Sequence, residues 1–415
     1  MIEVVQSSAN SMHICYITHN LPYGAYEAFI IPELKYIMRS GHRVQVIPFL
    51  PEKNVTHQDC DFLLKHSVRM PLLNGAILLG ALQEVIRSPW AVVKSLVPLR
   101  KSRNLAVFMK NLAAAPKSLW LAGHLRRTGV PDHIHVHWIN ASATMAFITA
   151  AILNVPWSVT AHRGDIAANN LIAEKVQACS FVRCINQNGA SEIQRLTAGG
   201  EKICVLHMGV EMAEAADWTA VTKERGRKFS ILTPANLVEV KGHYYLIQAI
   251  RILRAQGEEI QLDLAGDGVL KKEIQGQIKE AGLEDCIRLL GQLSHAALLS
   301  RLVSDQYDCV VLPSIVTERG DMEGTPVALI EAMAAGIPVI STKTGGIPEL
   351  CREGTAILVQ EKDSQALAEA LLLLMRDASG GAARLAAAKT LVKEQFYIAT
   401  IGQELLRLFE KFRKK

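Results

Sequence analysis

Two carboxylates with seven residues between them, Glu323 and Glu331, mark the part of the sequence most suited to chemistry. The pattern around them predicts a helix over residues 326–335, with Glu323, Gly324 and Thr325 just before its first turn. Free backbone N–H groups at the start of a helix attract phosphate or another anion. One carboxylate beside such a site and a second inside the helix suggest a ligand with a phosphate and two hydroxyl-bearing ends, as in a nucleotide sugar.

The limits of this helix follow from residue type. Thr325 is expected to cap it, Pro326 to occupy its first position and Gly336 to end it in the left-handed conformation. The alternative is an ordinary amphipathic helix with two solvated acids. The flanking glycines and prolines argue against that alternative.

This run resembles the E-x7-E signature of the family-4 retaining glycosyltransferases. The sequence of residues 321–342 resembles that of the subgroup that builds colanic acid and related bacterial exopolysaccharides. The resemblance covers nearly the whole chain. It implies that Glu323 lies against the donor sugar and that Glu331 binds the ribose hydroxyls. It also implies an α/β fold of the GT-B type, in which two Rossmann-like doubly wound domains face a cleft and the last helix crosses back to the first domain.

A loop in the second half of the chain offers groups for a donor diphosphate. Residues 236–242 follow a predicted strand and resemble the family loop whose Arg and Lys hold the diphosphate. Lys241 matches the Lys, whereas Asn236 stands at the Arg position and carries no charge. Arg319, shortly before Glu323, is a candidate to supply the missing cation.

Two further turns resemble the border of the nucleotide site in this family. Residues 266–268 match a structural Gly-Asp-Gly turn, and Leu293 belongs to a loop whose backbone reads the base. Such contacts leave UDP and GDP both open. No cofactor and no metal are expected, because the helix start and Lys241 would stabilise the leaving diphosphate as a divalent cation does in other transferases.

In the first half of the chain, His162, Arg163 and Asp165 follow a predicted strand, at the end where doubly wound sheets bind ligands. The run resembles a family motif whose His contacts the donor sugar near the reacting carbon. His162 is therefore assigned to the catalytic group together with Glu323 and Lys241. Arg163 replaces the more usual Gly, and this change is expected to alter the fit of the acceptor.

Three imidazoles, His133, His135 and His137, alternate along one predicted strand and so share a face. Zinc is the first candidate for such a set. Neighbouring strand positions spread the ligands too far to close on one ion, so we expect no metal there. The residues expected on the acceptor side are Glu27, His137, Arg163 and Asp165.

Strands alternate with helices along the chain, which predicts parallel, doubly wound sheets. Predicted strands in the first half cover residues 13–18, 44–50, 134–138, 157–161, 181–185 and 203–206, with helices at 26–40, 141–153 and 188–197. In the second half, predicted strands cover residues 229–233, 260–265, 287–290 and 309–312, with helices at 242–256, 269–281 and 295–303.

The chain has 415 residues, more than one hydrophobic core usually serves. We expect an acceptor-side domain over residues 1–210, a charged linker over 211–228 and a nucleotide-sugar-binding domain over 229–394. The C-terminal helix, within residues 395–415, is expected to return to the first domain.

The eight Cys are scattered without a C-x-x-C pair, which favours reduced, mostly buried thiols over disulfides or a zinc site. The sequence shows neither an uncharged apolar stretch of 18 residues nor a signal-peptide pattern. A cytoplasmic protein, soluble or peripheral, is the expectation.

Residues 85–127 contain nine Lys and Arg and no Asp or Glu, interleaved with aliphatic residues, Trp90 and Trp120. Such a segment is typical of amphipathic helices on an anionic membrane surface, here the inner face of the cell membrane. The alternative is a solvated basic face on core helices. Nucleic acid is not expected, because no recognised binding motif accompanies the charge.

Together these features predict a retaining, metal-independent hexosyltransferase. It would move a sugar from a nucleotide-diphosphate donor to a lipid-linked oligosaccharide in bacterial surface polysaccharide synthesis. One alternative is a GT-B epimerase or hydrolase, and another is a non-catalytic nucleotide-sugar-binding partner, which Asn236 favours. A nicotinamide dehydrogenase is disfavoured because neither first turn carries G-x-G-x-x-G.

Overall fold

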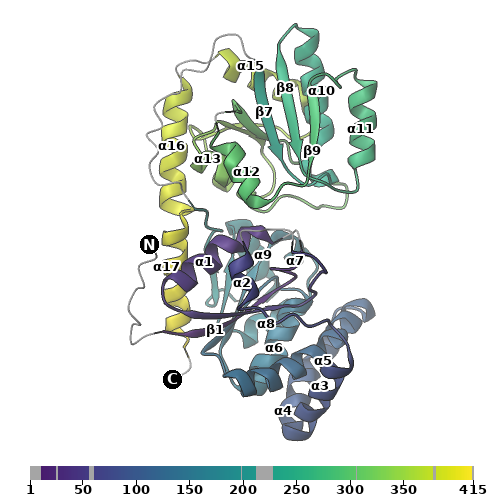
Figure 1. The fold of residues 1–415 in the computed structure, drawn as a ribbon, viewed down its shortest axis with the longest axis vertical. Helices are drawn as coiled ribbons and strands as arrows, with labels where there is room; N and C mark the ends of the chain where they lie inside the picture. Colours follow the sequence, from purple (N-terminus) through teal and green to yellow (C-terminus); the bar gives the residue numbers. More distant parts are fainter. Residues whose placement is uncertain are drawn as a thin grey trace. The chain divides into compact units, whose positions relative to one another are not determined.

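The computed structural model describes residues 11–24, 27–55, 60–197, 199–211, 228–304, 306–376 and 380–413. The chain divides into two compact units, shown in Figure 1. Unit 1 comprises Met1–His207 and Ile401–Lys415, and unit 2 comprises Met208–Thr400. Nearly all of the predicted linker, residues 211–228, lies outside the described residues.

Unit 1 is built on a six-stranded parallel sheet in the order β2-β1-β3-β4-β5-β6. The strands are β1 (His13–Thr18), β2 (Arg43–Pro48), β3 (His133–His137), β4 (Trp157–Ala161), β5 (Phe181–Cys184) and β6 (Ile203–Val205). The strand order reverses between β1 and β3. Ligands of open α/β sheets bind at such a switch point, beyond the carboxyl ends of the strands.

Helices cover both faces of this sheet. One face packs against α1 (Ile31–Arg39), the short η1 (Ala28–Ile30) before it and α17 (Ile398–Lys411). The helix α17 begins in unit 2 and ends in unit 1, where Leu405 and Phe409 are fully buried. The predicted return of the last helix to the first domain is thus confirmed. The other face packs against helices that include α5 (Leu105–Thr128), α6 (Ala141–Leu153), α8 (Ile172–Ala178) and α9 (Gln187–Thr197).

A group of helices projects from one end of unit 1 (Figure 1). Here α3 (Gly75–Arg87) packs on α5, and α4 (Pro89–Leu96) continues into η3 (Val97–Lys101). Among the described residues, no single helix has the length and apolar character needed to cross a membrane. Only the pair Gly75–Arg87 and Pro89–Lys101 passes that test together, and the pair is bent by 110°.

Unit 2 contains a second six-stranded parallel sheet, in the order β12-β11-β10-β7-β8-β9. This is the Rossmann strand order, with its reversal between β7 and β10. The strands are β7 (Phe229–Pro234), β8 (Ile260–Ala265), β9 (Ile287–Gly291), β10 (Cys309–Leu312), β11 (Val339–Thr342) and β12 (Ile357–Val359). The predicted class, two Rossmann-like doubly wound domains, is confirmed.

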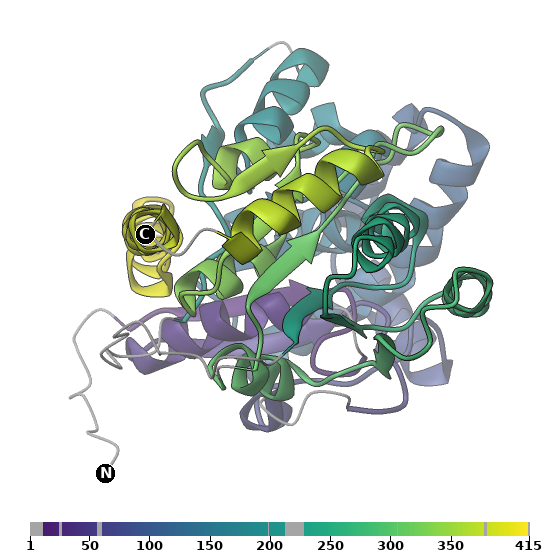
Figure 2. The ribbon, with the colours of Figure 1, turned by 90° about the horizontal axis from the view of Figure 1, so that it is seen from above.

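Alternate residues of each central strand in unit 2 enter different cores. Ile231 packs with α10 (His243–Ala255), α11 (Lys271–Glu280) and α15 (Ser364–Arg376), while its neighbour Leu232 packs with the helices of the other face. Those helices are α12 (His295–Leu302), α13 (Val327–Ala334), α14 (Ile347–Leu350) and α16 (Gly380–Gln395). Seen from above, the strands of this unit run between its helices (Figure 2).

Candidate functional site

In unit 2, the loops after β7 and β10 meet at the switch point of the sheet. The loop after β7 contains η4 (Glu239–Lys241) and then Gly242, whose φ is 64°. A Cβ at Gly242 would lie 2.0 Å from the carbonyl oxygen of Pro313, directly after β10. Only glycine allows this approach, so Gly242 brings Lys241 to the end of β10.

Lys241 forms an ion pair with Glu323. Its Nζ lies 2.5 Å from Glu323 Oε2, and the Ser314 hydroxyl donates to the same oxygen over 3.2 Å. The two charged side chains are only 18% and 14% exposed. The backbone of Glu323 is fixed as well, because a Cβ at Gly345 would stand 2.0 Å from its carbonyl oxygen. The structure therefore joins two residues that the sequence assigned to one reaction.

The helix that follows, α13, begins at Val327, one residue later than predicted. Pro326 is its N-cap in extended conformation, and no side chain caps it. The prediction that Thr325 caps the helix with Pro326 in the first helical position was wrong, because Pro326 itself stays outside the helix. The predicted stop is confirmed, since Gly336 has a φ of 73°.

Glu331 lies inside α13 and is 6% exposed. Its Oε1 lies 2.7 Å from Nε2 of His295, at the start of α12. Sequence reasoning missed His295, although a His directly after the N-cap Ser294 was visible as a polar residue in a helix start. Glu331 also borders a cavity of about 260 Å³, whose other walls include Leu299, Leu302 and Val303.

A second cavity of about 210 Å³ lies at the carboxyl ends of β7 and β8, beside the segment that follows β9. Asn236, Lys241 and Leu293 line it, together with Gly266. The structure thus brings Asn236, Lys241 and Leu293 to one cavity, as their shared assignment to the donor requires. Arg319 lies in an exposed turn.

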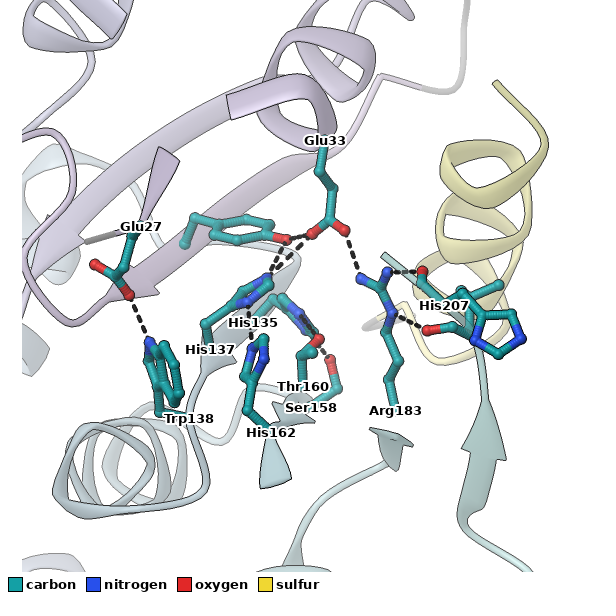
Figure 3. A network of polar contacts seen from close by, with 12 residues as sticks. Glu27, Glu33, His135, His137, Trp138, Ser158, Thr160, His162, Arg183 and His207 are labelled. Carbon is teal, nitrogen blue, oxygen red and sulfur yellow. Dashed lines mark hydrogen bonds and ion pairs between the residues drawn. The ribbon is translucent and has the colours of Figure 1, made fainter. Parts of the chain in front are cut away.

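In unit 1, a chain of buried polar side chains crosses the carboxyl ends of β1, β3, β4 and β5 (Figure 3). His137, at the end of β3, lies 3.1 Å from His162 Nε2 through its Nδ1 and 3.2 Å from Glu33 Oε1 through its Nε2. The Tyr16 hydroxyl of β1 donates to the same Glu33 oxygen. His137 is fully buried, so it would influence a ligand through His162.

Arg183 of β5 completes this network. Its guanidinium binds Glu33 Oε2 at 2.5 Å and donates to the carbonyl oxygens of Leu206 and His207. Burial alone would raise the pKa of Glu33, but the charge of Arg183 and the hydrogen bond from His137 outweigh burial and hold the pKa well below its usual range. Glu33 is therefore a carboxylate, and His137 faces a negative oxygen.

His162 stands at the N-cap of α7 (Arg163–Ala167) and is 6% exposed. Its ring lies 4.2 Å from the Trp138 ring, centroid to centroid. Burial lowers the pKa of His162 well below its ordinary value, and the nearby His137 lowers it further. The imidazole is thus neutral at physiological pH and suited to hydrogen bonding.

Two of the residues predicted on the acceptor side hold loops. Glu27 accepts hydrogen bonds from the backbone N–H groups of His19, Asn20 and Leu21, and from the Trp138 indole. Trp138 itself has a φ of 75°, an unusual conformation for a non-glycine residue at the ligand end of a strand.

Asp165 accepts from the backbone N–H of His162 and of Ile139, which ties α7 to the loop after β3. Burial raises its pKa to about 7. Arg163 forms an ion pair with Glu192. Contacts of Glu27, His137, Arg163 and Asp165 with an acceptor remain predictions.

Three residues could act as metal ligands, Glu33, His135 and His137; one potential ligand atom of each lies within 4.8 Å of the other two. This set differs from the three imidazoles that the sequence suggested, because Glu33 replaces His133. Both nitrogens of His135 are already paired, with Ser158 Oγ at 2.7 Å and Thr160 Oγ1 at 2.9 Å. Both nitrogens of His137 are paired as well, so the contacts fit a hydrogen-bond network better than a metal centre.

Sequence comparison finds similar proteins for about half of the chain. Residues 215–390 match the family model of the group 1 glycosyl transferases. The chain is 36% identical over 224 residues to the WcaL protein of Salmonella typhimurium, named for colanic acid biosynthesis, and 35% identical over 212 residues to the amylovoran biosynthesis glycosyltransferase AmsK of Erwinia amylovora. These alignments cover 53% and 51% of this chain. The chain spans about half the length of the curated relatives it matches, 54% and 51% respectively.

Solved structures match over almost the whole chain. HepE of Anabaena in complex with UDP-glucose aligns with a TM-score of 0.70 at 18% identity, over 96% of this chain and all of that one. Sucrose-phosphate synthase of Thermosynechococcus elongatus aligns with a TM-score of 0.71, also at 18% identity, over 96% and 98%. The fold is that of the GT-B glycosyltransferases. The resemblance to family-4 glycosyltransferases of the exopolysaccharide subgroup, expected from the sequence, is confirmed.

Proposed function

We propose that this chain is a retaining glycosyltransferase of exopolysaccharide synthesis that uses a UDP- or GDP-linked hexose as donor. The observation that carries the proposal is the Lys241 and Glu323 pair at the switch point of unit 2, beside a cavity and ahead of the α13 start. A cation at this place can balance a diphosphate, and a carboxylate can bind sugar hydroxyls. The relatives named for colanic acid and amylovoran synthesis support the same chemistry.

The residues have distinct parts in this proposal. Lys241 and the N–H groups at the start of α13 stabilise the leaving diphosphate without a metal. Glu323 positions the sugar and Glu331 the ribose. A contact of His162 with the sugar remains a prediction from the sequence. The leaving phosphate itself assists the acceptor hydroxyl on the same face of the sugar, so no carboxylate base is required.

We also propose that the acceptor is a lipid-linked oligosaccharide and that the protein works as a peripheral protein on the inner face of the cell membrane. The support is chemical. A growing polysaccharide unit must stay accessible to an enzyme of the cytoplasmic side, and unit 1 exposes apolar and basic residues together.

The test begins with the donor. Thermal unfolding in the presence of a panel of UDP- and GDP-sugars should show one sugar that raises the melting temperature more than its bare diphosphate does, because a ligand specific for the native state stabilises it by mass action. Glu331→Ala should weaken that donor by about 10- to 150-fold, the loss of a charged hydrogen bond. An unchanged donor affinity by calorimetry would remove Glu331 from the site.

Nucleotide release then separates the alternatives. A transferase releases the diphosphate only with an acceptor-lipid extract from the source cells, and the product should keep the anomeric configuration of the donor by NMR. Release without an acceptor would assign a hydrolase or epimerase. Binding of a nucleotide sugar with no release under either condition would assign a non-catalytic partner.

A further inference from the structure

The helices that project from unit 1 expose an unusual amount of apolar surface. Ile86 of α3 is 73% exposed, Trp90 of α4 is 78% exposed and Leu105 of α5 is 73% exposed. We call the whole set the apolar ridge; its members are Leu78, Leu79, Leu82, Ile86, Trp90, Val93, Val97, Leu105, Met109 and Leu112. A soluble surface rarely gathers so many large apolar side chains on neighbouring helices.

The spacing of these residues gives each helix two apolar faces. On α3, Leu78, Leu82 and Ile86 recur every four residues and are exposed, while Ile77 and Ala81 face the core. One turn of an α-helix takes 3.6 residues, so the exposed three form a stripe along one side.

The same arrangement recurs on the neighbouring segment. Trp90, Val93 and Val97 are exposed there, while Val92 and Leu99 are buried. A helix of a soluble protein normally has one apolar stripe, facing the core. The second stripe of each segment is unexplained by the fold of unit 1.

The charge around the apolar ridge is mainly positive, and the acid Glu174, which belongs to α8, lies 3.5 Å from the exposed cation Lys101. Between Asp61 and Asp132 the only acidic residue is Glu84. Glu84 is 2% exposed and paired with Arg126 at 3.2 Å, so it contributes no surface charge. The exposed cations among these helices are Arg87, Lys94, Arg100, Lys101, Arg103, Lys110, Arg126 and Arg127.

Two residues of the predicted membrane segment, 85–127, do not belong to this surface. Lys117 is buried, and its Nζ donates to the carbonyl oxygens of Pro48, Phe49 and Met70 over 2.6 to 2.8 Å. Trp120 is 7% exposed and packs on Gly80, where a Cβ would lie 2.7 Å from its ring. The prediction that Trp120 and Lys117 face the membrane was wrong, because both hold α5 against its neighbours.

We propose that the apolar ridge inserts into one leaflet of an anionic bilayer, with Ile86 and Trp90 at its deepest point and the surrounding cations on the lipid phosphates. The occupant is a lipid surface and not a protein, because a mainly cationic rim around apolar side chains complements the anionic headgroups and acyl chains of one leaflet. A helix pair bent by 110° suits insertion without crossing. The purpose of the insertion, access to a lipid-linked acceptor, rests on the proposed function.

The test uses the full-length protein and vesicles of phosphatidylcholine with or without 30% phosphatidylglycerol. Wild type should sediment with the anionic vesicles, and its fluorescence should shift to the blue and be quenched by lipids brominated on the acyl chain. Trp90→Phe should lose most of this response, because Trp90 is the exposed indole of the ridge. An absence of quenching in wild type would overturn insertion.

Two sets of variants separate apolar from electrostatic binding. Ile86→Asp with Trp90→Asp should abolish insertion, and Lys94→Glu with Arg100→Glu and Arg103→Glu should weaken vesicle binding by about a hundredfold or more, since each cation near an anionic surface has a sizeable effect. Lys101 is left intact because it pairs with Glu174. The matched controls lie in unit 2: Val269→Asp, 88% exposed, and Lys272→Glu with Lys279→Glu.

Each outcome decides the matter. Full vesicle binding by Ile86→Asp with Trp90→Asp would overturn insertion and leave only surface attraction. A dimer of wild type that these two changes dissociate, without vesicle binding, would assign the ridge to a second copy of the chain. Donor binding, measured by calorimetry on every variant, should remain at the wild-type level. An absence of donor binding by the wild-type protein would instead count against the proposed function.

Discussion

Lys241 has one charged partner in the structure and, in the proposed function, would take a second. Without a ligand, its ammonium group is balanced by Glu323 at 2.5 Å, in a place that is less than a fifth exposed. Leaving a partly buried carboxylate or ammonium group unpaired is costly, so each residue keeps the other in place. A bound diphosphate would draw the ammonium toward itself, and Glu323 would then be released to bind sugar hydroxyls.

We expect Lys241→Met to lower turnover by about 10²- to 10³-fold, the usual cost of losing one group that stabilises a developing negative charge. Asn236→Ala should lower it by only about 2- to 10-fold, because a neutral hydrogen bond is worth less. Asn236→Arg should leave turnover unchanged or raise it. Steady-state kinetics with the donor found above measures all three, and a larger loss for Asn236→Ala than for Lys241→Met would contradict the phosphate assignment.

The residues with unusual environments were visible in the sequence, but their partners were not. A charged residue inside an apolar strand, as Arg183 is between Val182 and Cys184, signals a buried ion pair. Its partner Glu33 is 150 positions away on α1, and no spacing rule joins residues so distant. The same limit hid His295 beside Glu331.

At the scale of elements, α17 is part of the core of unit 1. The ring centroid of Phe409 lies 4.9 Å from that of His133 and 5.2 Å from that of His135, and Phe409 is fully buried. The polar strand β3 therefore gains its apolar cover from the far end of the chain.

We expect Phe409→Ala to lower the free energy of unfolding of unit 1 by about 3 to 5 kcal/mol, the range for removal of a buried aromatic ring. Phe412→Ala is the matched control, since Phe412 is half-buried at the end of the same helix and should cost less. Chemical denaturation followed by Trp fluorescence measures both. Equal losses for the two variants would show that α17 does not complete this core.

Elements were predictable where burial and hydrophobicity coincide. The strands β1, β4, β8 and β10 have the predicted bounds, because they are apolar runs buried in a parallel sheet. The sequence did not predict the start of α3, because this helix has one exposed and one buried apolar stripe. Its two faces therefore differ little in hydrophobicity. Hydrophobicity alone does not distinguish a residue that faces the core from one that faces lipid.

At the scale of the whole molecule, buried imidazoles link stability to pH. Burial lowers the pKa of His133 to about 3, below the usual 6.5. The unfolded chain therefore binds a proton in the range between these values that the folded protein does not bind. The stabilising contribution is complete above about pH 6.5 and is lost as the pH falls toward 3. Asp165, with a pKa raised to about 7, acts in the opposite direction.

We expect His133 alone to cost about 2 kcal/mol of stability between pH 7.5 and pH 5.0, by linkage from its unfolded pKa. His133→Phe should reduce this loss of stability between the two pH values by that amount, while Ser158 keeps its contact with His135. Denaturant unfolding of wild type and variant at the two pH values provides the measurement, and the unchanged Asp165 cancels in the difference. An equal loss of unfolding free energy in wild type and variant would show that His133 is not held neutral.

The place of α17 in the chain also has a consequence for biosynthesis. A ribosome makes the six strands of unit 1 first, yet Phe409, which covers their histidines, is made only after unit 2. Domains generally fold in the order of their synthesis. Here the first domain to be translated is the last that can be finished, so nascent unit 1 must wait, with its polar strand uncovered, until the whole of unit 2 has been made.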